Sequence, residues 1–364
     1  MNAERLHAIA NALNKEMKET GIVNKLQNLI NALQNVVNQP VPQNQQQLAN
    51  NIKTVYDTLA SRPIDAFSPA WRQILSDMGG NDLFGNSLKI AIKKIFNANQ
   101  ITPAVALTEL QQLHSQLSKF QSALENLTSA LRQFNIGDEK LQPGQCEIGM
   151  LIPRKAVDNR LPEFADELEE IAFVLNIFSE ISTGKKEELD IKTISSSDLT
   201  VYLNATATFS ACFAVAIERI VTLYKQLLEI RKLRSDLQKQ GVPDEQTKGI
   251  EDYANKLMDN GIEKLSLEIV TNFYKGNDEG RKNELLNATH ISLNRLANRV
   301  DRGYNFEVRV EPFRGNEQDT NKEELKNVQI IQAAAKNMEF MKLEGQPILR
   351  LLEGKEKHKT KKEK

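Results

Sequence analysis

Residues 199–241 read LTVYLNATATFSACFAVAIERIVTLYKQLLEIRKLRSDLQKQG, and this stretch decides the fold of the domain around it. Its first nineteen residues carry no charge, whereas the remainder is rich in charge and ends at a glycine. Residues 199–205 alternate between apolar and polar side chains, as in a strand. Asn204 and Thr206 are favourable residues for a helix amino-terminal cap, and Gly241 is typical of a helix end. We therefore expect a strand that leads directly into one long helix.

A membrane span is the alternative interpretation of the uncharged run. A span needs about 20 consecutive, predominantly apolar residues. The part expected to be helical, residues 205–217, would be roughly 20 Å long at 1.5 Å per residue, shorter than the roughly 30 Å of a bilayer core. Polar side chains also interrupt the run, at Thr200, Asn204, Thr206, Thr208 and Ser210. These features favour a helix buried in a protein core.

Strand-like runs precede this stretch. The apolar side chains of Cys146, Ile148 and Met150 alternate with their neighbours, and this run ends at Pro153. The run ELDIKTIS, residues 188–195, comes directly before the opening stretch. Small polar residues separate the two, which is typical of a hairpin turn. Between these runs, residues 161–182 have the spacing of an amphipathic helix.

Two further amphipathic helices and a last strand-like run follow the long helix. Arg234 stands at a core-spaced position on the otherwise apolar face of that helix. The run YNFEVRVEPF, residues 304–313, places Phe306 and Val308 on one face and Glu307 on the other, as in a half-exposed strand. We expect this strand to join the same sheet. The result would be about four strands with helices over one face, an α+β arrangement.

The amino-terminal part has the most regular helical pattern. Between residues 102 and 135, apolar side chains recur at alternating steps of three and four, which is the seam of a coiled coil over about four heptads. Of the positions that flank the seam, Glu109 alone is charged, whereas free-standing dimers usually choose partners through charges there. We favour packing within the chain over an intermolecular zipper. The possible interaction seam consists of Leu110, Leu113, Leu117, Phe120, Leu124, Leu127, Leu131 and Phe134.

These patterns predict a mostly helical α+β protein in three parts. Residues 1–138 form a helical bundle or coiled coil, in which the amide-rich residues 38–51 form a loop or polar linker. Residues 139–313 form the α+β domain, with a small sheet packed with long helices. Residues 314–364 contain a polar linker, a short helix and a disordered tail with six lysines near its end.

No motif of enzyme chemistry stands out. The chain has two cysteines and four histidines among its 364 residues, and none shows a zinc-binding spacing. No Walker A sequence and no G-x-G-x-x-G occur. We predict no catalytic residue, no metal site and no cofactor, and an enzyme is the less favoured class.

A local group of arginines is the one candidate for anion binding. Arg295, Arg299 and Arg302 lie four and three residues apart, so they form a stripe on one helix. With Arg309 and Arg314 they would make a possible anion-binding patch. The net charge of −1 excludes a generally basic nucleic-acid binder, and the acidic residues between the arginines favour a solvated face.

The expected function is therefore a non-enzymatic, cytoplasmic protein–protein interaction or assembly module, such as a scaffold, with a protein partner or self-association into an oligomer. The cytoplasmic location follows from the amino terminus, which lacks the layout of a signal peptide. One alternative is a nucleic-acid-associated protein that uses the arginine stripe and the lysine-rich tail. A third is a membrane-acting effector, although the membrane is the less favoured partner.

Overall fold

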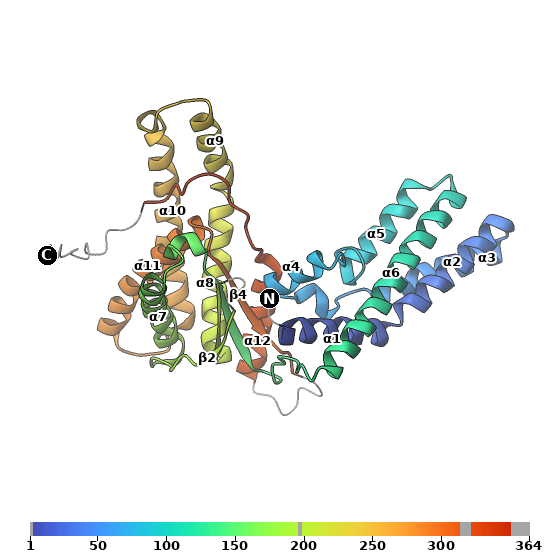
Figure 1. Ribbon diagram of the computed structural model, residues 1–364, viewed down its shortest axis with the longest axis horizontal. Helices are drawn as coiled ribbons and strands as arrows, with labels where there is room; N and C mark the ends of the chain where they lie inside the picture. Colours follow the sequence, from blue (N-terminus) through green and yellow to red (C-terminus); the bar gives the residue numbers. More distant parts are fainter. Residues whose placement is uncertain (1–2, 196–198, 314–321, 351–364) are drawn as a thin grey trace. The chain divides into compact units, whose positions relative to one another are not determined.

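The computed structural model describes residues 3–195, 199–313 and 322–350. Within these residues the protein is a mostly helical α+β protein, as expected, with twelve α-helices and a four-stranded antiparallel sheet (Figure 1). The chain divides into two compact units, Met1–Lys140 and Leu141–Lys364. We describe each unit by itself.

Unit 1 is entirely helical in its described residues. Its elements are α1 (Ala3–Thr20), α2 (Ile22–Asn38), α3 (Pro42–Thr58), the 3-10 helix η1 (Pro63–Ala66), α4 (Pro69–Asp77), α5 (Gly85–Ala98) and α6 (Pro103–Gln133). The sequence patterns did not predict α5. Gly21, with a φ of 56°, separates α1 from α2 in a backbone conformation that favours glycine.

The prediction of a loop or polar linker at residues 38–51 was wrong for most of this range, because α3 already begins at Pro42. Proline is well tolerated in the first turn of a helix, where its missing N–H has no intrahelical partner to lose. The amide side chains then bond within the helix: Gln46 donates to the Oδ1 of Asn50 at 3.1 Å, and Asn51 donates to the carbonyl of Gln47 at 2.9 Å. Local bonding of this kind makes an amide-rich run compatible with a helix.

The predicted seam lies on α6 and packs against α1, α2 and α5 of the same unit. Leu110 and Leu117 are fully buried, and the ring of Phe120 meets that of Phe84 edge to face at 5.7 Å. A polar contact adds to the packing, because the buried amide of Asn14 donates to the carbonyl of Leu124 at 3.2 Å. Leu113, Leu124 and Leu131 are buried as well, Leu127 is partly buried, and Phe134 is 76% exposed at the helix end. The chain's own helices therefore cover most of the seam.

Replacing Leu117 by alanine tests whether the seam serves the core of unit 1. We expect Leu117→Ala to lower the free energy of unfolding by about 2–5 kcal/mol, because it removes a fully buried side chain and leaves a cavity. The molar mass in solution should stay unchanged. Urea unfolding and light scattering give the two readings. The control is Gln116→Ala, at an exposed neighbouring position, with an expected effect within about 0.5 kcal/mol. A change of molar mass confined to Leu117→Ala would instead indicate an intermolecular seam.

Unit 2 contains the sheet, whose strand order is β2-β3-β1-β4. The strands are β1 (Cys146–Leu151), β2 (Ile191–Ser195), β3 (Thr200–Ala205) and β4 (Asn305–Val310), and all neighbours pair antiparallel. The expected pairing of β2 with β3 is present, whereas the turn residues 196–198 lie outside the described residues. The last strand joins the same sheet beside β1, as the sequence indicated.

The expectation that β4 is half exposed was wrong, because Glu307 is only 2% exposed. In the register of the sheet, Gly149 of β1 pairs with both Tyr202 of β3 and Glu307 of β4. A Cβ at position 149 would lie 2.7 Å from the Tyr202 ring and 2.8 Å from the Glu307 Cγ, so the two side chains close over the glycine. Nearby, Glu147 is fully buried and pairs with Lys192 at 2.9 Å. This face of the sheet is therefore polar and buried.

Seven helical segments complete unit 2. They are η2 (Arg154–Val157), α7 (Leu161–Thr183), α8 (Ala207–Lys225), α9 (Leu228–Lys239), α10 (Asp244–Phe273), α11 (Glu279–Asp301) and α12 (Lys322–Asn337). The last of these, α12, is the short helix expected within residues 314–364. It packs against α8 and β4, so this part of the expected carboxyl-terminal region belongs to unit 2. Residues 314–321 and the lysine-rich tail lie outside the described residues.

The single long helix expected up to Gly241 is divided into α8 and α9. Thr206 caps α8 as predicted, accepting a hydrogen bond from the amide of Phe209 at 3.4 Å. After Lys225 the amides of Gln226 and Leu227 donate to carbonyls three residues back, at 3.2 and 2.8 Å, instead of four. This tighter turn interrupts the α-helical ladder.

The uncharged run of α8 lies in the core of unit 2, between the sheet and the helices α7, α10, α11 and α12. The ring of Phe213 lies 5.7 Å from that of Phe178 and 6.2 Å from that of Phe306, so it links α8 to α7 and β4. Within the described residues, α8 is the one helix long and apolar enough to cross a membrane, and 61% of its most apolar window is buried in the protein.

Both cysteines are free thiols in this core. Cys146 and Cys212 are fully buried, and burial raises the pKa of the Cys146 thiol to about 12 and also raises that of Cys212. Thiolates are the reactive form, so these two residues are inert members of the core.

The pKa of Cys146 predicts weaker folding at alkaline pH. Above pH 9 the thiol of the unfolded chain loses its proton while the folded thiol keeps it, so stability falls as pH rises towards 12. We expect the free energy of unfolding to fall between pH 8 and pH 10 by about 1 kcal/mol more in the native chain than in Cys146→Ala. Urea unfolding under reducing conditions measures this difference. Equal pH slopes for the two proteins would contradict the assignment.

Candidate functional site

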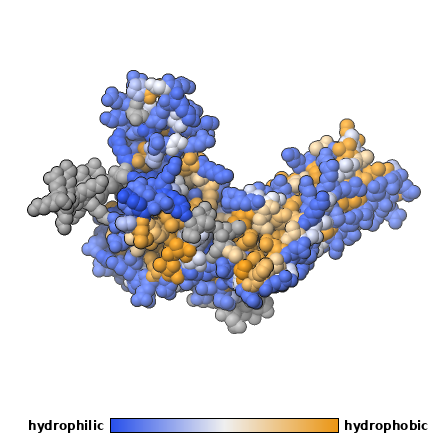
Figure 2. All heavy atoms as spheres, viewed as in Figure 1, coloured by the Kyte–Doolittle hydropathy of each residue, from blue (hydrophilic) through white to orange (hydrophobic). Residues whose placement is uncertain are grey.

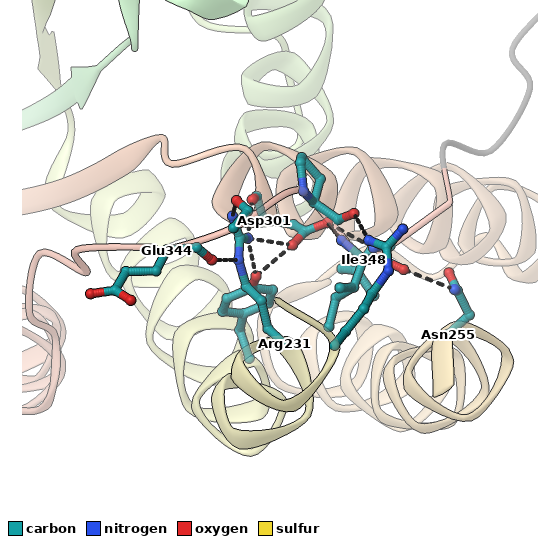
Figure 3. A network of polar contacts seen from close by, with 10 residues as sticks. Arg231, Asn255, Asp301, Glu344 and Ile348 are labelled. Atoms are coloured by element: carbon teal, nitrogen blue, oxygen red, sulfur yellow. Dashed lines mark hydrogen bonds and ion pairs between the residues drawn. The ribbon is translucent and has the colours of Figure 1, made fainter. Parts of the chain in front are cut away.

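Four polar side chains of unit 2 converge on a segment without regular secondary structure, residues 344–350 (Figure 3). Arg231 and Arg234 come from α9, Asn255 comes from α10, and Asp301 is the last residue of α11. We call these four residues the clamp. They lie up to 70 positions apart in the chain, so only the packing of the three helices brings them together.

The centre of the clamp is a buried ion pair. Nη1 of Arg231 lies 2.8 Å from Oδ1 of Asp301, and both residues are at most 5% exposed. The hydroxyl of Tyr224 donates to the same carboxylate oxygen at 2.5 Å and accepts from Arg231 at 2.7 Å. Burial and the charge of Asp301 raise the pKa of Tyr224, so the phenol stays a neutral donor. The pair therefore has the additional hydrogen bonds that a buried ion pair requires.

The two arginines bind carbonyl groups of the segment. Arg231 donates from Nε to the carbonyl of Glu344 and from Nη2 to that of Gly345, both at 2.7 Å. Arg234 donates to the carbonyl of Pro347 at 2.9 Å and pairs with Glu251 at 2.5 Å. The planar guanidinium group of Arg231 thus holds two successive carbonyls through its fixed fork of donors.

Asp301 and Asn255 bind the second half of the segment. The Oδ2 of Asp301 accepts from the amides of Ile348 and Leu349, at 2.8 and 2.7 Å. Asn255 donates to the carbonyl of Ile348 at 3.2 Å and accepts from the amide of Arg350 at 2.7 Å. One side-chain amide therefore bonds main-chain groups two residues apart, in the way a neighbouring strand does.

The segment contributes little to the core through its own side chains. Ile348 is 3% exposed and is its one buried side chain, whereas Leu349 is partly buried. Burying an isoleucine contributes about 1.5–3 kcal/mol, and ordering the backbone costs about 1–2 kcal/mol for each residue. The remaining side chains are exposed: Glu344, Gln346, Pro347 and Arg350. The segment is therefore held mainly through main-chain groups, and the clamp must supply most of the favourable free energy.

Removing one partner of the ion pair tests the clamp. We expect Arg231→Met or Asp301→Asn to lower the free energy of unfolding by about 3–5 kcal/mol, because each change leaves a buried group without its partner. The double variant should lose less than the sum of the two. Urea unfolding gives the values. Arg219→Met, at a side chain that is 52% exposed, is the matched control. Single effects below about 1 kcal/mol would show that the clamp does not stabilise the unit.

Within the described residues, glutamates pair with three of the predicted anion-binding arginines. Arg295 pairs with Glu170 at 2.7 Å and lies over the ring of Phe173, and Arg299 pairs with Glu167 at 2.6 Å. Arg302 is exposed directly after the end of α11, and Arg309 of β4 lies 3.5 Å from the buried Glu147 of β1. Arg314 lies outside the described residues. Glutamates thus compensate much of the charge, and anion binding stays a prediction.

Of the four clamp residues, the sequence patterns singled out only Arg234. Arg234 stood at a core-spaced position of a predicted helix, where a charged side chain needs a buried partner. Arg231 lies on the same face, since it follows the buried Leu227 by four residues. No local pattern marks Asp301 or Asn255 as the residues that complete the site.

One cleft of unit 2 is lined by charged and polar residues together with apolar ones. It has a volume of about 670 Å³ and lies between the end of α7, the start of α8, and residues of α11 and α12. Charged residues around it pair with one another, Arg281 with Glu180 and Lys275 with Glu323. No group of three or more potential metal ligands occurs in the part of the chain that the structure describes.

Comparisons with protein-family models, with curated proteins and with solved structures found no match for this chain. The functional interpretation therefore rests on the geometry of the chain itself.

Proposed function

We propose that the protein is a non-enzymatic interaction or assembly module whose second unit receives a peptide segment. The observation that carries the proposal is the set of bonds between the clamp and the main chain of residues 344–350, four to carbonyl oxygens and three to amides. Peptide-recognition surfaces commonly obtain affinity from main-chain hydrogen bonds and specificity from pockets for single side chains. The clamp supplies the main-chain bonds, and the side chain of Ile348 is buried in the core cluster of unit 2.

Exposed apolar side chains close to the clamp support a binding role. Leu233 precedes Arg234 on α9 and is 53% exposed, and Tyr253 follows Asp252 on α10 and is 61% exposed. Hydrophilic residues cover most of the α9–α10 hairpin (Figure 2). Large apolar or aromatic side chains that are surrounded by polar residues are typical of protein interfaces.

The alternatives have no comparable observation in their favour. Glutamates of α7 neutralise Arg295 and Arg299, which a nucleic-acid site would use for phosphate contacts. The apolar helix α8 is already engaged in the core of unit 2. We therefore propose an interaction role rather than nucleic-acid or membrane binding.

A photo-crosslinking amino acid at position 253 of the full-length chain tests the proposed function in the cells that make the protein. We expect light-dependent products of discrete mass, because Tyr253 is exposed and lies on α10 two positions before Asn255 of the clamp. Mass spectrometry then distinguishes a second copy of the chain from another protein. The control carries the same amino acid at Lys264, an exposed position further along α10. Identical products from both positions, or none from either, would argue against the proposal.

A further inference from the structure

We infer that the clamp is a receptor site for a partner's peptide with glycine at one position and isoleucine three positions later. The chain's own residues 344–350 occupy this site as an internal competitor. The inference rests on the proposed function and specifies its partner as a protein with such a segment. Three features of the bound segment carry it: the chemistry of its contacts, the constraint on two of its positions, and its place in the chain.

The contacts recognise a main-chain path rather than a set of side chains. Arg231 and Arg234 bind carbonyl oxygens, and Asp301 and Asn255 bind the amides that follow. The side chain of Gln346, between the two arginine contacts, is exposed. A foreign segment that follows the same path would present the same carbonyl and amide groups to the clamp.

Two positions restrict the sequence of the ligand. Gly345 has a φ of 73°, a backbone conformation that residues with a side chain rarely adopt. A Cβ at this position would also lie only 2.9 Å from the Cβ of Ser235, so any other residue would be in steric conflict with Ser235. Ile348 is buried in the core cluster of unit 2. The amide of residue 347 is not needed, because this residue is a proline. The ligand sequence is therefore Gly-x-x-Ile, with proline accepted before the isoleucine.

The place of the segment allows exchange. It follows α12, the last helix in the part of the chain that the structure describes, so it can leave the clamp without α12 unfolding first. Its outer ion pair, Arg350 with Asp252, joins two side chains that are each 58% exposed, and exposed pairs of this kind add little. A peptide in solution can thus compete for the same groups.

Fluorescence anisotropy with the labelled peptide KLEGQPILR, residues 342–350, tests the inference on the full-length chain. The variant Gly345→Val displaces the chain's own segment and leaves the clamp intact. We expect this variant to bind the peptide at least tenfold more tightly than the native chain does, because the native site is filled. Two controls should lose at least tenfold in affinity: the peptide KLEVQPILR, and the chain that carries both Gly345→Val and Arg231→Met.

A second measurement needs no variant. An excess of the peptide added to the native chain should accelerate hydrogen exchange at the amides of Ile348 and Leu349, since these amides lose their bonds to Asp301 on displacement. Unchanged exchange, together with equal peptide affinity of the native and Gly345→Val chains, would overturn the inference. If the peptide fails to bind while position 253 still yields specific crosslinks, this inference falls and the proposed function stands.

Discussion

The architecture of unit 2 around its carboxyl-terminal segment depends on one buried ion pair, Arg231 with Asp301. Removing two charges from water is costly, and their mutual attraction offsets that cost only when other hydrogen bonds satisfy the remaining donors and acceptors. Here Tyr224 of α8 and main-chain groups of residues 344–350 supply those bonds. The pair therefore links α8, α9, α11 and the segment in one network, and a peptide that replaces the segment must supply the same main-chain groups.

The network also indicates the kind of function that unit 2 is suited for. Its ionisable groups are engaged in contacts with one another or with the main chain, and the raised pKa of Tyr224 keeps the phenol a hydrogen-bond donor. A site of this kind holds a ligand in place. Because its contacts with residues 344–350 are made to the main chain, many sequences could satisfy them, and Gly345 and Ile348 add selectivity. These properties are those expected of an interaction module.

The core beneath the site is built for rigidity. The aromatic rings of Phe178, Phe213 and Phe306 tie α8 to α7 and to the sheet, and the opposite face of the sheet buries Glu147 in an ion pair with Lys192. Close packing of this kind resists displacement. Asp301 at the end of α11, a helix that packs on α7 and α8, is therefore held in position, as main-chain recognition at hydrogen-bond distance requires.

Periodicity, caps and turn residues were enough to predict the helical α+β class, the pairing of β2 with β3, and two candidate caps for α8, Asn204 and Thr206, of which Thr206 is the cap. These features depend on neighbours in the chain, so the sequence by itself determined them. Local patterns failed where contacts that they do not record determined the structure. They did not predict the helix α3 in an amide-rich run, the break after Lys225, or the burial of Glu307 beside Gly149. The clamp shows the limit most clearly. Arg231 and Asp301 are each ordinary charged residues in their own helices, and only the packing of those helices, which excludes water from both, turns them into one site.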